Sequence, residues 1–236
     1  MSVKFNPKKA FEVFKEKGGT TAFPDSLKDV LEFASKDDNI TTINQVAYLL
    51  ATAKVESDYS LQRWEADYLC GKQGVPYKDK PCQKAINYYR SSGGRKSNYF
   101  NLGVDKNGMP YFGRGLIQLT GKANYDYYGK KIGENLVNNG DLALVPKNSY
   151  KIASEYLKDR TWKFVNSNSL TSARKSVNGG NNGLSEVNAS YNFWLGILND
   201  KSVQETSAKP IILISLGILV LIGLGLGIYY QTKSIS

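Results

Sequence analysis

The chain has 236 residues, enough for one large domain or two small ones, and a formal net charge of +10. Because Lys209 and Lys233 are the only charged residues after Glu205, the first 205 residues carry +8, which favours an anionic partner such as nucleic acid, anionic lipid or a cell-wall polymer. The absence of histidine excludes Ser-His-Asp and Cys-His catalysis and every histidine-ligated metal site.

The N-terminal part of the chain shows helical periodicity. Residues 5–17 predict a short amphipathic helix, and apolar residues at helical spacing predict a second one after Pro24. Thr41-Thr42 indicates an N-cap for a third helix over residues 43–57. Glu56 falls in the last turn of that helix, on or beside the face that enters the core. A carboxyl held there would be partly desolvated, which suits a general acid.

From Leu61 to Pro110 the periodicity is lost, and long irregular regions of this kind usually carry function or disorder. Short strands are expected only near residues 98–113. Cys70 and Cys82 are too few for a disulfide framework or a four-cysteine zinc site. They could pair across a short loop in an oxidising compartment, or both could be free thiols.

Helical periodicity returns over residues 116–133, 146–163 and 184–199. We therefore expect a domain over residues 1–199, followed by a polar linker at 200–210.

The segment IILISLGILVLIGLGLGIYY, residues 211–230, is uncharged and long enough to cross a bilayer as a helix. The N-terminus lacks the apolar stretch of a secretory signal. The sequence thus predicts a single-pass C-terminal membrane anchor with a short polar tail at 231–236. It does not fix the orientation of the anchor in the membrane.

The stretch YFGRGLIQLTGKANYDYYG, residues 111–129, does not fit a phosphate-binding loop, because Gln118 stands where G-x-G-x-x-G needs its third glycine.

Because the chain has no histidine, acid–base chemistry must come from carboxylates. Glu56 and Glu65 lie nine residues apart and would face opposite ways on one helix. They can converge only if the chain turns after about Ser57. Two carboxylates across a cleft suit the cleavage of a glycosidic bond.

Four segments resemble glycoside hydrolase family 19, which comprises chitinases and bacteriophage-type endolysins. The resemblance covers roughly residues 43–199. Its segments, in chain order, are VESDYSLQRWEADY, YFGRGLIQLTGKANYDYYG, ENLVNNGDLALVP and VNGGNNGLSEVNASY. It implies a mainly helical, α+β lysozyme-like fold, bilobed with a small β-hairpin region, and inverting hydrolysis of a β-1,4 bond to an N-acetylhexosamine.

The resemblance also implies residue roles. Glu56 matches the general acid and Glu65 the general base, while Thr120 matches the hydroxyl residue that positions the attacking water. Gln118, Asn124 and Asn178 match groups that bind the sugars. From residue type alone, Tyr111 and Trp64 are further candidates for contact with a pyranose face. No cofactor or metal is expected.

Several of these residues also have structural interpretations. Asn178 could be a turn residue, Arg114 a structural ion-pair partner, and Tyr125 and Tyr128 core residues. The glycines at 113, 115, 179 and 180 are expected to permit tight turns more than to touch substrate.

The chain also departs from the family pattern at three positions. Val55 replaces a histidine, the arginine expected after the NGG run is replaced near Val187, and Gly140 stands where proline is common. The first two changes remove groups that would orient the catalytic side chains or adjust their charge.

These features predict a membrane-anchored hydrolase of peptidoglycan glycan strands, a phage lysis protein or virion-associated lysin in a virion inner membrane or bacterial envelope. The alternatives are a chitinase, a lytic transglycosylase and a non-catalytic glycan-binding virion protein. The basic segment 72–96, with its interspersed tyrosines, could contact nucleic acid. A solvated loop over the cleft explains that segment as well, so no nucleic acid partner is expected. The lipid bilayer is the second expected partner, and the sequence does not indicate an oligomeric state.

Overall fold

A computed structural model of the chain describes residues 3–71, 82–91, 100 and 103–204. By its internal contacts the chain divides into two compact units, residues 1–205 and 206–236. None of the described helices is both long and apolar enough to cross a membrane. The predicted anchor at 211–230 lies outside the described residues, so it stays a prediction.

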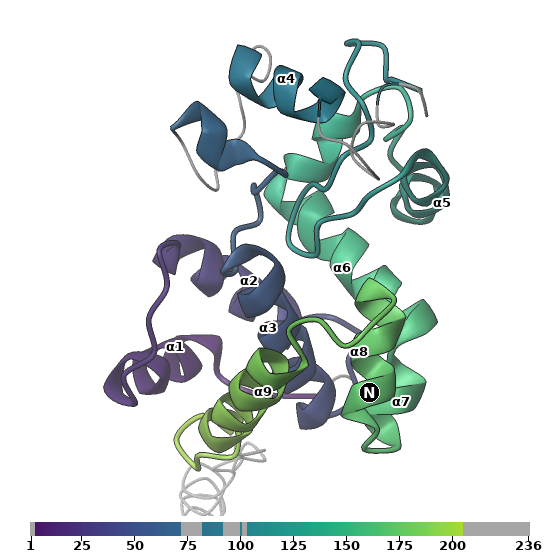
Figure 1. The fold of residues 1–236 in the computed structure, drawn as a ribbon. Coiled ribbons are helices and arrows are strands. Elements are labelled where there is room, and N and C mark those ends of the chain that lie inside the picture. The colour runs from purple at the N-terminus through teal and green to yellow at the C-terminus, as the bar shows by residue number, and fades with distance from the viewer. Residues whose placement is uncertain (1–2, 72–81, 92–99, 101–102, 205–236) are drawn as a thin grey trace, which may run out of the picture. The chain divides into compact units, whose positions relative to one another are not determined.

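The domain begins with two helices that pack against each other, α1 (Pro7–Glu16) and α2 (Pro24–Ser35) (Figure 1). Asn6 caps α1 by accepting a hydrogen bond from the Lys9 amide at 3.1 Å. The two ends of the domain meet here, because Phe5 and Gln204 form an antiparallel bridge and the Asn6 amide donates to the Val203 carbonyl at 2.7 Å.

The core is built around α3 (Ile43–Ser57), which packs along α9 (Leu184–Leu198). Thr42 and Gln45 form a capping box that starts α3 where the sequence predicted it. The two helices meet through aromatic side chains, with Tyr48 and Tyr191 edge to face at 6.4 Å. The α3 helix is buried along most of its length, so it is a rigid base for groups at its C-terminal end.

The second half of the chain is also helical. Its elements are α5 (Lys122–Ile132), the 3₁₀ turn η2 (Gly140–Leu144), α6 (Pro146–Arg160), α7 (Trp162–Asn166) and α8 (Leu170–Asn178). The helix predicted over 116–133 begins only at Lys122, because Gln118 has a φ of 53° and residues 114 and 119 form a bridge. The helix predicted over 146–163 ends at Arg160, and α8 was not predicted.

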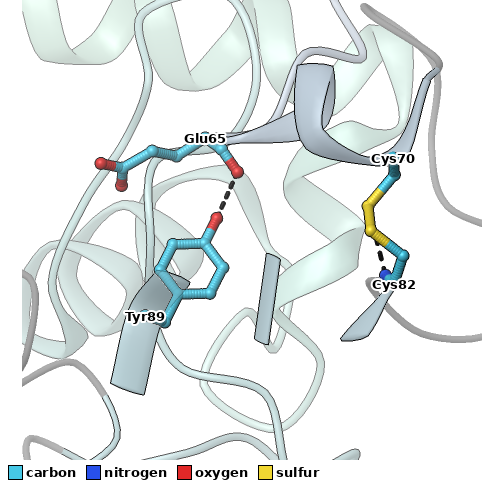
Figure 2. Close-up of a disulfide and its surroundings, with 4 residues drawn as sticks. All are labelled: Glu65, Cys70, Cys82 and Tyr89. Atoms are coloured by element: carbon cyan, nitrogen blue, oxygen red, sulfur yellow. Dashed lines mark hydrogen bonds between the residues drawn. A yellow bond between two sulfur atoms is a disulfide. The ribbon is translucent and has the colours of Figure 1, made fainter. Parts of the chain in front are cut away.

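Within the irregular region the structure has a short 3₁₀ turn, η1 (Asp67–Cys70), and the helix α4 (Gln83–Ser91). A disulfide joins Cys70 to Cys82 and so ties the end of η1 to the start of α4 (Figure 2). A second, smaller hydrophobic cluster lies here. In it the rings of Tyr89 and Phe112 stack at 4.9 Å.

The small β-hairpin region expected from the resemblance is reduced to isolated bridges in the described residues. Phe112 and Arg114, in the segment where strands were expected, are buried by side-chain packing and by an ion pair. The mainly helical fold is confirmed. The expected division into two lobes stays a prediction.

Candidate active site

The structure brings residues from five segments together around one cleft of about 390 Å³. These segments are the end of α3, the segment around residue 65, the stretch 113–124, Tyr156 of α6 and the end of α8. Six of the eight residues predicted for the site line this cleft: Glu56, Glu65, Gln118, Thr120, Asn124 and Asn178.

Glu56 reaches the cleft because α3 ends immediately after it. Asp58 caps the helix in the left-handed conformation, with a φ of 52°, so the chain reverses after Ser57. The reversal is held by a 2.5 Å ion pair between Asp58 and Lys54. The Ser57 hydroxyl also donates to the Leu116 carbonyl at 2.8 Å and fastens the helix end to the opposite wall. The turn predicted after Ser57 is confirmed.

Arg174 on α8 forms an ion pair with Glu56, from its guanidinium Nη1 to Oε1 at 2.5 Å. The arginine side chain is 5% exposed and that of Glu56 20%, so the pair is largely shielded from water. Arg174 also donates through Nε to the Asn182 carbonyl at 2.7 Å. A Cβ at Gly183, which has a φ of 70°, would lie 3.1 Å from Val55 and 3.2 Å from Arg174. The absence of a side chain at Gly183 thus lets the arginine reach Glu56.

Glu65, which also lines the cleft, is fixed by its backbone. Its amide donates to the Gly113 carbonyl at 2.7 Å, and the Tyr89 hydroxyl of α4 donates to its carbonyl (Figure 2). In Figure 2 the carboxylate extends away from Tyr89 and from the disulfide. The Gly113 amide donates to Oε2 of Glu65 at 3.3 Å. The glycine therefore brings backbone, and no side chain, beside this carboxylate.

A tight turn carries the polar side chains of the wall. Gly115, with a φ of 76°, has no room for a Cβ, which would lie 2.9 Å from the Ala143 carbonyl oxygen. Gln118 donates both amide hydrogens to backbone carbonyls, those of Arg63 at 3.1 Å and Gly115 at 2.9 Å. Its Oε1 lies 3.0 Å from where a Cβ at position 113 would be, and Gln118 and Gly113 both line the cleft. The Thr120 hydroxyl donates to the Gln118 carbonyl at 2.8 Å.

The two asparagines of the cleft are both held by hydrogen bonds. Asn124 donates to the Thr120 carbonyl at 2.7 Å and accepts from Arg160 at 3.0 Å. Asn178 donates to the Asn182 carbonyl at 2.7 Å, so it serves as a turn residue while it also lines the cleft.

Two predicted sugar contacts are wrong. Trp64 is 1% exposed and packs against Phe112, while Tyr111 is 4% exposed and donates its hydroxyl to the Val137 carbonyl at 2.9 Å. Both aromatic rings stabilise the walls of the cleft from behind. Neither is among the side chains that line it.

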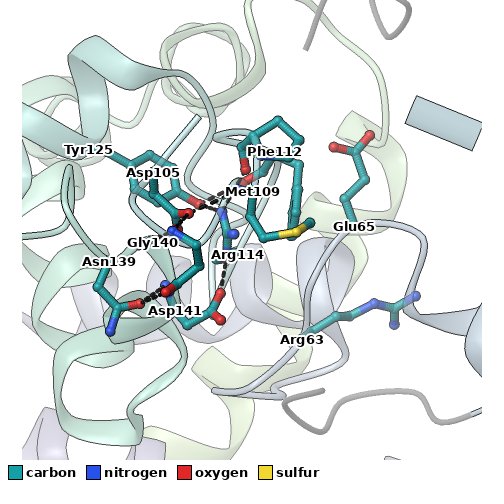
Figure 3. A network of polar contacts seen from close by, with 12 residues as sticks. Arg63, Glu65, Asp105, Met109, Phe112, Arg114, Tyr125, Asn139, Gly140 and Asp141 are labelled. Atoms are coloured by element: carbon teal, nitrogen blue, oxygen red, sulfur yellow. Dashed lines mark hydrogen bonds and ion pairs between the residues drawn. The ribbon is translucent and has the colours of Figure 1, made fainter. Parts of the chain in front are cut away.

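Arg114 is a structural ion-pair partner, as the sequence analysis had suggested. It is buried and pairs with Asp141 at 3.0 Å, and it donates to the Tyr125 hydroxyl at 2.9 Å (Figure 3). Burial raises the pKa of Tyr125 to about 12, so its neutral hydroxyl donates to the Phe112 carbonyl at 2.6 Å. Figure 3 shows the Glu65 carboxylate pointing away from this network.

The departures from the family pattern also have structural explanations. Val187 is buried, but Arg174, which precedes the NGG run, supplies a cation to Glu56. A cation therefore contacts Glu56 from another position, and the expected effect of the replacement near Val187 stays a prediction. Gly140 donates its amide to Asp105 at 3.0 Å, a bond that proline cannot make. A Cβ at Gly140 would also lie 3.0 Å from Arg114.

Sequence reasoning missed Arg174. The only signal was its place four residues before Asn178, shortly before the segment VNGGNNGLSEVNASY begins. Its ion pair forms between residues 118 positions apart, a separation over which local patterns give no information.

The sequence profile of the glycoside hydrolase 19 family, described as chitinase class I, matches residues 20–162, more than half of the chain. The chain belongs to glycoside hydrolase family 19. The match includes both candidate carboxylates and the 111–129 stretch, and it ends before Arg174.

Curated relatives of this family 19 chain match it over short stretches. An acidic 27 kDa endochitinase of Solanum lycopersicum is 60% identical over 35 residues, which are 15% of this chain and 14% of the relative. A glycosyl hydrolase family 19 domain-containing protein of Haemophilus influenzae is 38% identical over 97 residues, 38% of this chain and 44% of the relative. The chain therefore spans less than half the length of either.

Solved structures are similar in fold. Chitinase C from Streptomyces griseus HUT6037 superposes with a TM-score of 0.50 at 20% identity, over 82% of this chain and 76% of that one. A bacterial family 19 chitinase superposes equally well, at 19% identity, over 82% of this chain and 94% of that one. These likenesses concern the family 19 fold alone.

Proposed function

We propose that the chain is a glycoside hydrolase that cleaves β-1,4 bonds between N-acetylhexosamines. The observation that carries this proposal is that Glu56 and Glu65 line the same cleft, among amide and hydroxyl side chains. Such a carboxylate pair supplies the acid and the base that glycoside hydrolysis needs.

Glu56 is the general acid in this mechanism. Arg174 contacts its Oε1, so Oε2 is the oxygen that carries the proton to the leaving glycosidic oxygen. When the proton has left, Arg174 stabilises the carboxylate charge in surroundings with little water. The same ion pair keeps the side chain in one orientation between turnovers.

Glu65 is the general base, and it activates a water on the opposite face of the sugar. The Thr120 hydroxyl helps to hold that water, while Oε1 of Gln118 accepts a hydrogen bond from a sugar amide or hydroxyl. Direct attack by water from the face opposite the leaving group inverts the anomeric carbon.

Peptidoglycan is the proposed substrate, and the proposed setting is a lysis protein anchored by residues 211–230 in a virion inner membrane or bacterial envelope. The support is the charge of +8 over the first 205 residues, which suits an anionic wall, and the apolar run after residue 210. Chitin is the second candidate, because several relatives are named chitinases or endochitinases.

The test is hydrolysis of purified peptidoglycan and of N-acetylglucosamine hexamer by the full chain and its variants. Glu56→Gln and Glu65→Gln should each lower kcat by about 10²–10⁴-fold, because each removes one partner of the proton transfers. Glu16→Gln, an exposed acid at the end of α1, is the matched control and should leave kcat unchanged. Mass spectrometry of the released muropeptides identifies the bond that is cut.

Two outcomes would reject this mechanism. Full activity of Glu65→Gln together with 1,6-anhydro products would indicate a lytic transglycosylase. Binding of peptidoglycan without release of reducing ends, unaffected by Glu56→Gln, would indicate a non-catalytic glycan-binding protein.

A further inference from the structure

Arg160, the last residue of α6, lies at the rim of the cleft. Its guanidinium donates to Oδ1 of Asn124 at 3.0 Å and to the Tyr156 hydroxyl at 3.4 Å, and both of these residues line the cleft. The guanidinium also lies over two aromatic rings, 4.6 Å from the centroid of Tyr156 and 5.9 Å from that of Tyr128. These contacts hold the charged group in a fixed orientation while the residue as a whole stays exposed.

This cation forms no ion pair with a carboxylate of the described residues. Its neighbour in sequence, Asp159, pairs with Lys131 at 2.6 Å instead. Asn124 and Tyr156, which hold the guanidinium, are both uncharged. The guanidinium of Arg160 is thus held in one orientation, and no carboxylate among the described residues balances its positive charge. Its planar group matches the geometry of a carboxylate.

The side chains that line the cleft bring acidic groups to it. Among the described residues that line it, Glu56 and Glu65 are the charged ones, and none is a lysine or arginine. Arg174, behind this lining, pairs with Glu56 and offsets its charge. The carboxylate of Glu65 adds a further negative charge, which repels a substrate carboxylate. Arg160 is placed to attract such a carboxylate, beside Asn124, which lines the cleft.

We propose that Arg160 forms a carboxylate-binding subsite, which selects acid-bearing N-acetylhexosamine strands over neutral ones. Chitin has no carboxylate. Peptidoglycan carries a lactyl carboxyl on alternate sugars, either free or extended by a peptide that ends in carboxylates. The inference rests on the proposed hydrolysis in this cleft and deepens it by naming the chemical feature that the substrate must have.

The experiment compares the full chain with Arg160→Gln, Arg160→Lys and Lys163→Gln on two substrates. The substrates are peptide-free glycan strands with free lactyl carboxylates and the neutral N-acetylglucosamine hexamer. Arg160→Gln should lower kcat/KM for the carboxylated strands about tenfold or more, mainly through KM, and change that for the neutral hexamer less than twofold. Arg160→Lys should recover part of the loss. Lys163→Gln removes a nearby exposed charge and should match the unmodified chain.

The results separate this inference from the proposed function. Equal losses on both substrates would mean that Arg160 only orients Asn124, and no loss on either would mean that it does not touch substrate. Either result overturns the inference and leaves the hydrolase proposal standing. Dissociation constants for the same two glycans are measured in parallel, so the inference is decided even if the chain releases no reducing ends.

Discussion

The ion pair between Glu56 and Arg174 combines a short contact with little exposure to water. Charges in such surroundings interact more strongly than on an open surface, but each also loses hydration, so removal of one partner leaves the other unfavourably placed. Arg174 is in addition anchored through Nε to the Asn182 carbonyl, which also accepts from Asn178. The acid therefore depends on a side chain that is itself fixed by the NGG loop.

Arg174→Gln should lower kcat by about 10²-fold with little change in KM, because the Glu56 carboxylate loses the cation that orients it and offsets its charge. The free energy of unfolding should fall by about 2 kcal/mol, less than for a fully buried pair because Glu56 keeps some exposure. Steady-state kinetics and urea unfolding measure the two effects.

Arg174→Lys separates orientation of the acid from folding, since it should recover part of kcat, whereas a purely structural role would predict only a change in stability. Lys175→Gln, at the neighbouring exposed position on α8, is the charge-matched control. An Arg174→Gln variant with unchanged kcat would show that Glu56 needs no partner.

At the scale of elements, the position of Glu65 depends on α4. Tyr89 of this helix donates to the Glu65 carbonyl, and its ring stacks on Phe112. The disulfide between Cys70 and Cys82 fixes the start of α4 with respect to η1. One wall of the cleft is therefore secured by a covalent bond as well as by packing.

Replacement of both cysteines, Cys70→Ser with Cys82→Ser, should lower the free energy of unfolding by about 3 kcal/mol, because the closed loop no longer restricts the unfolded chain. The activity should fall as well, since α4 then holds Glu65 less firmly. Thermal unfolding with and without a reductant measures the effect. The reductant should lower the Tm of the unmodified chain and leave that of the double variant unchanged, and equal Tm values for all samples would contradict this role.

Local patterns predicted those elements whose causes are local. The α3 helix and its cap follow from Thr42 and from apolar periodicity, and the loss of that periodicity from Leu61 allows the reversal after Ser57. The late start of α5 did not follow, because the turn before it depends on Ser149 and Ala143, which exclude a side chain at Gly115. The burial of Trp64 and Tyr111 likewise results from long-range packing. An aromatic residue beside a site residue has the same appearance in sequence whether it faces substrate or core.

At the scale of the whole molecule, the proposed hydrolase domain and the proposed anchor are separate units of one chain. Residues 1–205 form a compact unit whose ends are joined by the bridge of Phe5 to Gln204. The domain should therefore fold and act without the residues that follow it. Attachment to a bilayer would change where it acts without changing its chemistry.

The full chain should float with liposomes in a density gradient, and the chain truncated after Glu205 should remain at the bottom. The reason is that the truncated chain lacks the 20 uncharged residues 211–230, which are apolar apart from Ser215. Both should hydrolyse a soluble glycan at the same kcat. Anionic and neutral liposomes are compared, since binding by surface charge alone would require the anionic lipid and would persist after truncation. Flotation of neither protein would reject the anchor.

The α9 helix has one further consequence. It begins at Leu184, directly after Gly183, which lies against Val55 and Arg174 beside the cleft. The helix leads to the residues that pair with the start of the domain. Fifteen residues of helix extend about 22 Å. The cleft and the Phe5–Gln204 bridge, where the domain ends, thus lie at opposite ends of α9. The groups at the cleft end of α9 therefore lie about one helix length from the Phe5–Gln204 bridge within the domain.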